Sequence, residues 1–266
     1  MAVIITVNIQ KGGVGKTTTA HELASNLSEM DYRVLAIDLD QQQNLSAIAG
    51  AQLVGYYNIY DLLKGACTFE DCVQQGKHYD IAVAGKKLSE AEKEFSNWDD
   101  VYTLDISLKE HKVREKYDFI IIDTPPNLGI LPSMALSASD YVLIPVEASS
   151  SGAQGLGQLY ERIEKVRHPH RGTNKDLKIA GMLLTMFNSR TKFTQHMKLQ
   201  LEGIASSMQT KIFKTFIRTA IVVKESQGWR ESLAVYDPKS KPAQDYKTLT
   251  MELLEDINKE MKINNG

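Results

Sequence analysis

Apolar residues gather in short runs along the chain, and stretches with helical periodicity separate most of these runs. The first run, residues 2–7, is rich in β-branched side chains, which is typical of a buried strand. Residues 17–30 follow, with apolar side chains three and four positions apart, as on one face of a helix. The other strand-like runs are residues 33–38, 80–84, 118–123, 141–146 and 178–187. This alternation predicts an α/β fold with a doubly wound, mostly parallel sheet and helices on both faces.

Length and composition place this fold in one domain. The 266 residues, 42% of them hydrophobic, are enough to build a single α/β domain over residues 1–266. The connection 40–78 is expected to hold short helices at the edge of the sheet. Cys67 and Cys72 are the only cysteines, and their spacing supports neither a disulfide framework nor a tetrahedral metal site. No apolar stretch approaches the ~20 residues of a membrane span, and no cationic signal region precedes the first strand, so a cytoplasmic setting is expected.

The charged residues are unevenly distributed, although the formal net charge is only −2. Residues 89–110 hold seven acidic and two basic side chains. Residues 186–230 hold eight Lys or Arg side chains against only Glu202 and Glu225. The later segment therefore predicts a basic face.

A phosphate-binding loop lies between the first strand and the first helix, where residues 11–18 read KGGVGKTT. Its glycines let the backbone take positive φ and turn N–H groups toward a phosphate, at the positive end of the following helix. Lys16 is then expected to reach the β- and γ-phosphates of a nucleotide, and Thr17 to ligate Mg²⁺. The predicted nucleotide-binding residues of the loop are Lys11, Gly12, Gly13, Val14, Gly15, Lys16, Thr17 and Thr18.

The loop departs from the usual phosphate-loop pattern, because Gln10 stands where a glycine is expected and Lys11 adds a second lysine. In this form it resembles the deviant Walker A motif of the ParA/MinD superfamily of P-loop ATPases. The resemblance implies that ATP and Mg²⁺ are the ligands and that Lys11 and Lys16 act in catalysis. In this family the extra lysine reaches across a dimer interface to the partner's nucleotide, so an ATP-dependent homodimer is implied.

Asp123 ends the apolar run 120–122, and a hydrophobic strand followed by an acid is the Walker B pattern. Ligands of open α/β sheets bind where the strands end, so Asp123 is expected to hold Mg²⁺ through its water shell. Pro125 and Pro126 end the strand and stiffen the following loop. The resemblance implies that this loop senses the γ-phosphate. An acid that only caps a helix is the alternative.

Asp38 and Asp40 form a second acidic pair at the end of the strand 33–38. The pair resembles the family's D-x-D-P-Q switch, which implies that Asp40 positions or activates the attacking water and that Asp38 lies nearer the metal. Gln41 stands in place of the proline, so we expect a more mobile loop. Asp40 as a mere helix cap is the alternative. The predicted metal residues are Thr17, Asp38 and Asp123.

Asn188 follows the strand-like run 178–187 in a segment that is similar to the family's adenine-side loop. The resemblance implies that Asn188 hydrogen-bonds the base, because an amide offers both a donor and an acceptor. An asparagine in a turn after a strand is the alternative.

The order of the motifs is similar to that of short ParA/Soj-type partition ATPases. For this type the resemblance implies that the ATP-bound dimer binds DNA without sequence preference and is then nucleoid-associated. A ParB-like, centromere-binding partner stimulates the weak intrinsic hydrolysis. The candidate phosphate contacts are Arg190, Lys192, Lys198, Lys211, Lys214, Arg218, Lys224 and Arg230. Arg218, which shares a predicted helix over 217–227 with Lys224, is favoured, followed by Arg190 and Lys211.

Other functions share this scaffold. A MinD-like membrane-cycling ATPase needs a final amphipathic helix with a basic polar face. The expected helix over 243–261 has an apolar stripe from Tyr246 to Met261 but an acidic polar face, so it is expected to pack on the core and not on a membrane. An electron carrier of the nitrogenase-reductase kind needs a cluster cysteine beyond Asp123, and the sequence has none there. A small-molecule ligase remains the other alternative, although Lys11 and the basic segment argue against it.

Overall fold

Seven strands form one sheet in the order β3-β4-β2-β5-β1-β6-β7, in a computed structural model that describes residues 1–149, 153 and 155–264. All neighbouring strands are parallel except β3 and β4. The bounds are β1 Val3–Val7, β2 Val34–Asp38, β3 Val73–Gln75, β4 Asp80–Ala82, β5 Phe119–Asp123, β6 Tyr141–Glu147 and β7 Lys178–Thr185. The predicted α/β fold with a mostly parallel sheet is confirmed. Strand β3 lies in the connection 40–78, where short helices are expected. The sequence does not predict this strand, because its three residues are too few to show an alternating pattern.

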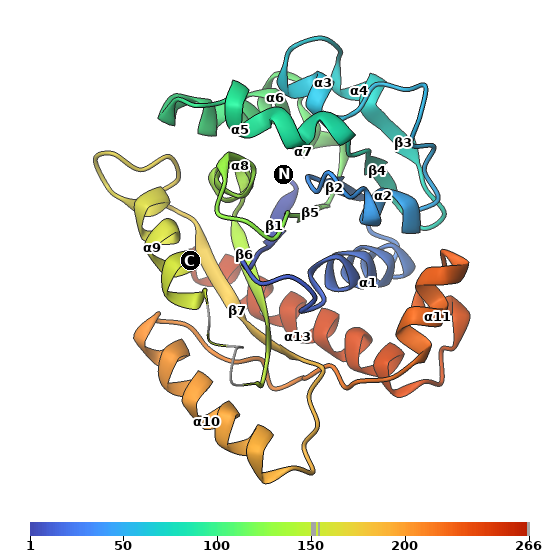
Figure 1. Cartoon of the computed structure of the whole chain (residues 1–266), viewed down its shortest axis with the longest axis vertical. Helices are drawn as coiled ribbons and strands as arrows, with labels where there is room; N and C mark the ends of the chain where they lie inside the picture. The colour runs from blue at the N-terminus through green and yellow to red at the C-terminus, as the bar shows by residue number, and fades with distance from the viewer. Residues whose placement is uncertain (150–152, 154, 265–266) are drawn as a thin grey trace.

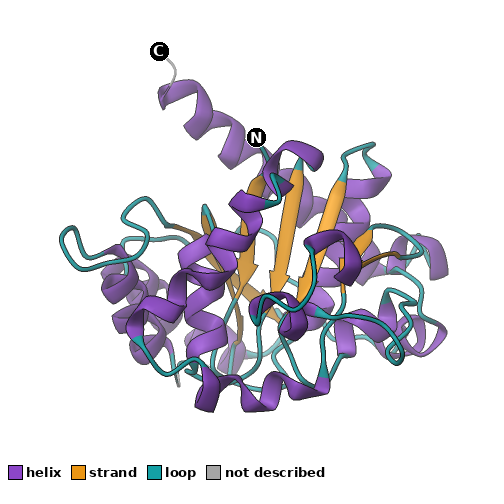
Figure 2. Cartoon of the chain, turned by 90° about the horizontal axis from the view of Figure 1, so that it is seen from above, coloured by secondary structure: helices purple, strands orange, loops and turns teal. Residues whose placement is uncertain are grey.

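Helices cover both faces of the sheet (Figures 1 and 2). Helices α1 and α13 share one hydrophobic core with the strands, whereas α8 and α9 pack on the opposite side. The helices are α1 Lys16–Glu29, α2 Asn44–Ile48, α3 Ile59–Leu63, α4 Phe69–Cys72, α5 Ala91–Glu94, α6 Thr103–Glu110, α7 Val113–Lys116, α8 Ile130–Ala138, α9 Leu156–Arg167, α10 Lys192–Ser207, α11 Val222–Trp229, α12 Leu233–Tyr236 and α13 Lys241–Asn264. Two 3₁₀ helices, η1 Lys86–Glu90 and η2 Trp98–Tyr102, flank α5.

The register of the central strands brings the predicted nucleotide-binding segments to one edge of the sheet. Asp123, the last residue of β5, lies opposite Val7 of β1 and Asp38 of β2. The phosphate loop continues from β1, and the Asp38–Asp40 pair ends β2. Because these strands are parallel, all three segments leave the sheet in the same direction, at its carboxyl edge.

The final helix packs on the core as expected. Tyr246, Leu249, Leu253 and Ile257 of α13 are buried in the cluster that includes α1. Met261 is an exception with 41% exposure, because the end of α13 projects from the body of the protein (Figure 2). No helix among the described residues is long and apolar enough to cross a membrane.

The helix predicted over 217–227 is wrong at its start, because α11 begins only at Val222. The preceding residues run beside β7 instead. Ile217 donates its N–H to Leu184 O and accepts from Phe187 N, at 2.8 and 2.9 Å. Phe213 continues the same pairing through Met182. Arg218 is therefore part of an extended segment and not of a helix.

Candidate functional site

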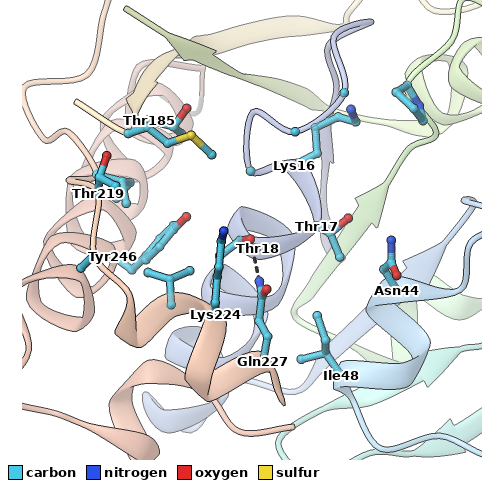
Figure 3. Close-up of a pocket in the computed structure, with 18 of the residues that line it drawn as sticks. Lys16, Thr17, Thr18, Asn44, Ile48, Thr185, Thr219, Lys224, Gln227 and Tyr246 are labelled. Atoms are coloured by element: carbon cyan, nitrogen blue, oxygen red, sulfur yellow. Dashed lines mark hydrogen bonds between the residues drawn. The ribbon is translucent and has the colours of Figure 1, made fainter. Parts of the chain in front are cut away.

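A pocket of 810 Å³ opens at the carboxyl edge of the sheet, and residues from six separate parts of the chain line it. Figure 3 shows Lys16 and Thr17 of the phosphate loop facing Asn44 of α2 on one side and Lys224 of α11 on the other. The pocket residues that the sequence predicts as nucleotide or catalytic residues are Gly12, Gly13, Gly15, Lys16, Thr17, Thr18 and Asp40. Arg218 and Lys224, which are predicted as DNA contacts, also line the pocket.

The phosphate loop has the backbone that its glycines predict. Gly13 and Gly15 adopt φ of 75° and 85°, which favour glycine, and Gly15 precedes α1 without a side-chain cap. The first N–H groups of α1 are thus left for a ligand at the positive end of the helix. The side chain of Val14 is buried in the core, and its carbonyl accepts from the Thr185 hydroxyl at 2.9 Å, so only its backbone N–H is left for a ligand.

Lys16 is the buried cation of the pocket, with 7% of its surface exposed. Its Nζ donates to the carbonyl of Lys11 at 3.0 Å. Burial lowers the pKa of Lys16, and the nearby Asp123 and Asp40 carboxylates act in the opposite direction. An anion in the pocket would also favour the charged ammonium, so the site is electrostatically suited to a phosphate.

Lys11 belongs to the same loop but does not line the pocket. Its Nζ pairs with Glu147 Oε2 at 3.0 Å, at the end of β6. Both side chains are partly exposed, at 25% and 35%. In this conformation Lys11 therefore contacts an acidic residue of its own chain and not the space where the loop would bind phosphate.

Asp123, the last residue of β5, does not itself line the pocket, and both of its carboxylate oxygens are buried without a hydrogen-bond partner among the described residues. Burial and the nearby Asp38 carboxylate raise its pKa well above the usual range, whereas Thr17 and Lys16 act to lower it. Two orphaned, buried oxygens are unusual in a folded protein. They fit a hydrated metal ion, which would supply both the hydrogen bonds and the positive charge.

Asp38 is completely buried, and the protein already occupies its carboxylate. Oδ1 accepts from the backbone N–H of Asp40 at 3.0 Å, and Oδ2 accepts from Ser46 N and Oγ at 2.9 and 2.7 Å. Burial raises its pKa to about 6. These contacts favour Asp38 as the residue that shapes the following loop, and Asp123 as the better placed of the two for a metal.

Asp40 lines the pocket with 8% exposure. Its Oδ1 accepts from the backbone N–H of Gln42 at 3.0 Å, and its carbonyl accepts from Gln43 N at 2.9 Å. The loop from 39 to 43 lacks the proline of the family pattern, but hydrogen bonds on both sides of Asp40 fix it in place. One carboxylate oxygen of Asp40 keeps acceptor capacity toward the pocket.

Asn188 does not line this pocket, and its contact with a base stays a prediction. It is exposed, and its Oδ1 accepts from Arg190 N at 3.1 Å in a turn before α10. Met186 adopts a left-handed φ of 51° just after β7. Thr185 and Met186 line the pocket in its place.

The far wall of the pocket comes from residues that no sequence motif indicates. Gln227 of α11 donates to the Thr18 hydroxyl at 2.7 Å and so ties α11 to the first turn of α1 (Figure 3). Tyr246 of α13 lines the pocket on the same side as Lys224 (Figure 3). The other lining residues on this wall are Ile217, Arg218, Thr219, Ala220, Val223 and Gly228.

Two of the eight residues of the predicted basic face, Lys211 and Arg218, are paired with acidic side chains of α13. Arg218, the favoured DNA contact, forms a bidentate ion pair with Asp245, with Nε–Oδ2 and Nη2–Oδ1 distances of 2.8 and 2.7 Å. Lys211 pairs with Asp256. On α10, Lys198 lies 3.7 Å from Glu202. Arg190, Lys192, Lys214, Lys224 and Arg230 form no ion pair within the described part of the chain.

Comparison with known proteins identifies related chains over almost the whole length. A family model described as an AAA domain matches residues 2–179. The chromosome partitioning protein ParA of Myxococcus xanthus is 33% identical over 263 residues, which cover 94% of this chain and 87% of the relative. The sporulation initiation inhibitor protein Soj of Bacillus subtilis is 34% identical over 258 residues, which cover 95% of this chain and 98% of the relative.

A solved structure with the same fold comes from a protein whose name does not refer to partition. Cobyrinic acid a,c-diamide synthase from Mycobacterium smegmatis, with bound ADP and magnesium, has a TM-score of 0.83 and 27% identity. The similarity covers 97% of this chain and 96% of that chain. The fold is therefore shared with a structure that holds a nucleotide and Mg²⁺. On the match of sequence, motifs and fold together, the chain belongs to the ParA/Soj family of partition ATPases, within the ParA/MinD group of P-loop ATPases.

Proposed function

We propose that this protein is an ATP-dependent DNA partition ATPase. ATP binding drives the formation of a sandwich homodimer, and the dimer binds DNA without sequence preference. A ParB-like, centromere-binding partner stimulates hydrolysis, which returns the protein to the monomer. The relatives named ParA and Soj support this assignment.

The observation that carries the proposal is the different placement of the two lysines of one loop. Lys16 lines the pocket and is positioned for the phosphates of its own chain's nucleotide. Lys11 does not line that pocket and pairs with Glu147. An ion pair between partly exposed side chains contributes at most about 1 kcal/mol, so a phosphate of a second chain would compete with Glu147 for Lys11. In this way Lys11 would couple ATP binding to dimerisation.

The side chains of the pocket fit a nucleotide triphosphate with Mg²⁺. The Thr17 hydroxyl and the Asp123 carboxylate are hard oxygen groups of the kind that Mg²⁺ prefers. No group of three or more His, Cys, Asp or Glu among the described residues could hold a metal ion by itself, so the nucleotide phosphates would complete the site. When bound, Mg²⁺ neutralises charge on the phosphates. Asp40 orients the attacking water through its remaining acceptor capacity.

Two alternatives make different predictions. A membrane-cycling ATPase of the MinD kind is disfavoured, because the acidic side chains of α13 pair with Lys211 and Arg218 and give the helix no basic face. A small-molecule ligase on the same scaffold gains some support from the fold shared with a cobyrinic acid a,c-diamide synthase. The Myxococcus xanthus relative, with 33% identity, is named for chromosome partitioning and favours partition.

Co-sedimentation with plasmid DNA and with anionic liposomes, each with ATP, ADP or no nucleotide, separates these functions. We expect the protein to sediment with DNA only in ATP and with liposomes in no condition. Lys16→Ala is the matched control, because loss of the phosphate contact should abolish ATP binding and with it any ATP-dependent sedimentation. Sedimentation with liposomes in ATP would support the membrane alternative, and absence of binding to either would favour a ligase.

A further inference from the structure

Gln43 is an unusual residue in the loop that carries Asp40. It adopts a left-handed backbone conformation with φ of 59° and ψ of 25°, which is uncommon for any residue other than glycine. Its side chain is buried, with 5% exposure, whereas Gln41 and Gln42 are exposed. Gln43 thus combines a rare backbone conformation with a buried side-chain amide. Both cost free energy, so a favourable contact is expected to compensate for them.

That contact is with Ala84, two residues beyond the end of β4. Nε2 of Gln43 donates to the carbonyl of Ala84 at 2.7 Å, in a buried environment. The backbone N–H of Ala84 donates in turn to the hydroxyl of Ser46 at 3.0 Å. Both polar backbone groups of Ala84 are therefore bound by side chains from the segment that follows Asp40. Buried hydrogen bonds of this kind fix a loop in one position, because breaking one leaves a buried polar group unpaired.

The same network reaches Asp40 from the other side. Ser46 donates from its backbone and its hydroxyl to Asp38 Oδ2, and Asp38 Oδ1 accepts from the N–H of Asp40. The turn closes through Gln43 N and the carbonyl of Asp40, at 2.9 Å. Asp40 is thus held between β2, through Asp38, and the residues just after β4, through Gln43.

We propose that Gln43 is a positioning residue for ATP turnover: by anchoring the loop to the Ala84 carbonyl, it orients the Asp40 carboxylate at the pocket. Its side chain does not line the pocket and so acts only through the loop. This inference rests on the proposed ATPase function. It assigns to Gln43 the constraint that a proline supplies in the D-x-D-P-Q pattern, where this chain has Gln41.

The test compares three single variants of the full chain. Gln43→Ala removes the amide, and Gln43→Gly removes the amide while it accepts the left-handed backbone without strain, so it keeps the loop foldable. Gln41→Ala is the matched control, because Gln41 is an exposed glutamine in the same loop. Single-turnover hydrolysis with excess protein gives the rate constant, titration with ATP gives the affinity, and hydrogen exchange reports on residues 38–47.

We expect both Gln43 variants to lose about tenfold in the rate constant, as a small misplacement of a catalytic group would cause. ATP affinity should stay within roughly twofold, since uniform binding is untouched. Exchange should be faster over 38–47 but unchanged over the phosphate loop, and Gln41→Ala should match wild type throughout.

Wild-type rates in both Gln43 variants would overturn the inference, as would recovery of the rate in Gln43→Gly alone, which would implicate backbone strain and not the amide. A loss of ATP affinity with an unchanged rate constant would also overturn it. If the wild-type chain itself shows no hydrolysis, with or without DNA, the proposed function fails together with the inference. An active wild type with unaffected variants contradicts the inference alone.

Discussion

The guanidinium of Arg218 is held by Asp245 of α13 through two hydrogen bonds, at 2.7 and 2.8 Å. The side chain of Asp245 is only 8% exposed, so Arg218 supplies hydrogen bonds that water can hardly replace there. A residue that the sequence marks as a DNA contact thus has a structural function in the monomer.

This pairing predicts that Arg218→Ala destabilises the protein. Loss of the guanidinium would leave the buried Asp245 carboxylate short of partners and lower the free energy of unfolding by about 1–3 kcal/mol. Urea denaturation of this variant measures the loss, and Lys214→Ala, which removes a cation without an ion pair, should change little. Normal stability combined with lost DNA binding would instead return Arg218 to the DNA-binding surface.

Arg190 and Lys192, near the start of α10, are better candidates for DNA phosphates than Arg218. Both are exposed and neither forms an ion pair within the described residues. The double variant Arg190→Glu with Lys192→Glu should weaken ATP-dependent DNA binding and reduce the slope of log affinity against log salt by about 2, since each lost phosphate contact removes about 1. The control is Lys175→Glu, an exposed cation before β7 at the opposite edge of the sheet. Equal effects of both changes would show only a general charge effect.

Glu22 of α1 predicts a pH dependence of stability. Both carboxylate oxygens accept from Leu233 N, at 3.1 and 3.2 Å, and burial raises the pKa of Glu22 to about 8 from a usual value of 4.5. The folded state therefore holds a proton that the unfolded state releases above pH 4.5. Its stabilising effect is complete below pH 4.5 and is lost as the pH rises toward 8, by at most about 1.4 kcal/mol per pH unit.

Glu22→Gln keeps the acceptor for Leu233 but cannot ionise. Chemical denaturation from pH 5 to pH 8 should show the variant gaining in free energy of unfolding relative to wild type as the pH rises. Because other groups titrate equally in both proteins, the difference between the two curves isolates Glu22. Parallel curves would mean that Glu22 is already ionised in the folded protein.

Asp40→Ala should bind ATP but turn it over slowly. The hydrogen bonds that Asp38 and Gln43 make in the loop do not involve the Asp40 carboxylate. The substitution removes only the bond from Gln42 N to that carboxylate, so the pocket should keep its shape. The expected result is an ATP dimer that stays on DNA, measured as slower dissociation in the presence of ATP. ATP turnover at the wild-type rate in this variant would remove Asp40 from the reaction.

The sequence indicates the parts of the site that follow directly from strand ends. The phosphate loop, Asp38 and Asp123 each continue an apolar run, and parallel pairing alone brings them to one edge of the sheet. Pairings between distant segments are not visible in the sequence. The ion pair of Arg218 joins residues 27 positions apart, and the wall formed by α11 has no motif.

Local backbone geometry is also not visible in the sequence. Met186 adopts a positive φ directly after β7, although the sequence around it reads as a polar loop after a strand. Gln43 is a similar case, because the role we propose for it depends on one buried hydrogen bond to Ala84. Such features depend on which residue occupies a rare conformation, and composition does not predict this.

The most direct test of the central claim compares the wild-type chain with Lys11→Ala in ATP and in ADP. Fluorescence anisotropy measures DNA binding, and light scattering measures dimerisation. We expect wild type to form a dimer and to bind DNA in ATP but not in ADP. Lys11→Ala should still bind ATP through Lys16 but remain a monomer without DNA affinity. An unchanged ATP-dependent dimer on DNA in Lys11→Ala would contradict the coupling of ATP to DNA binding through this lysine.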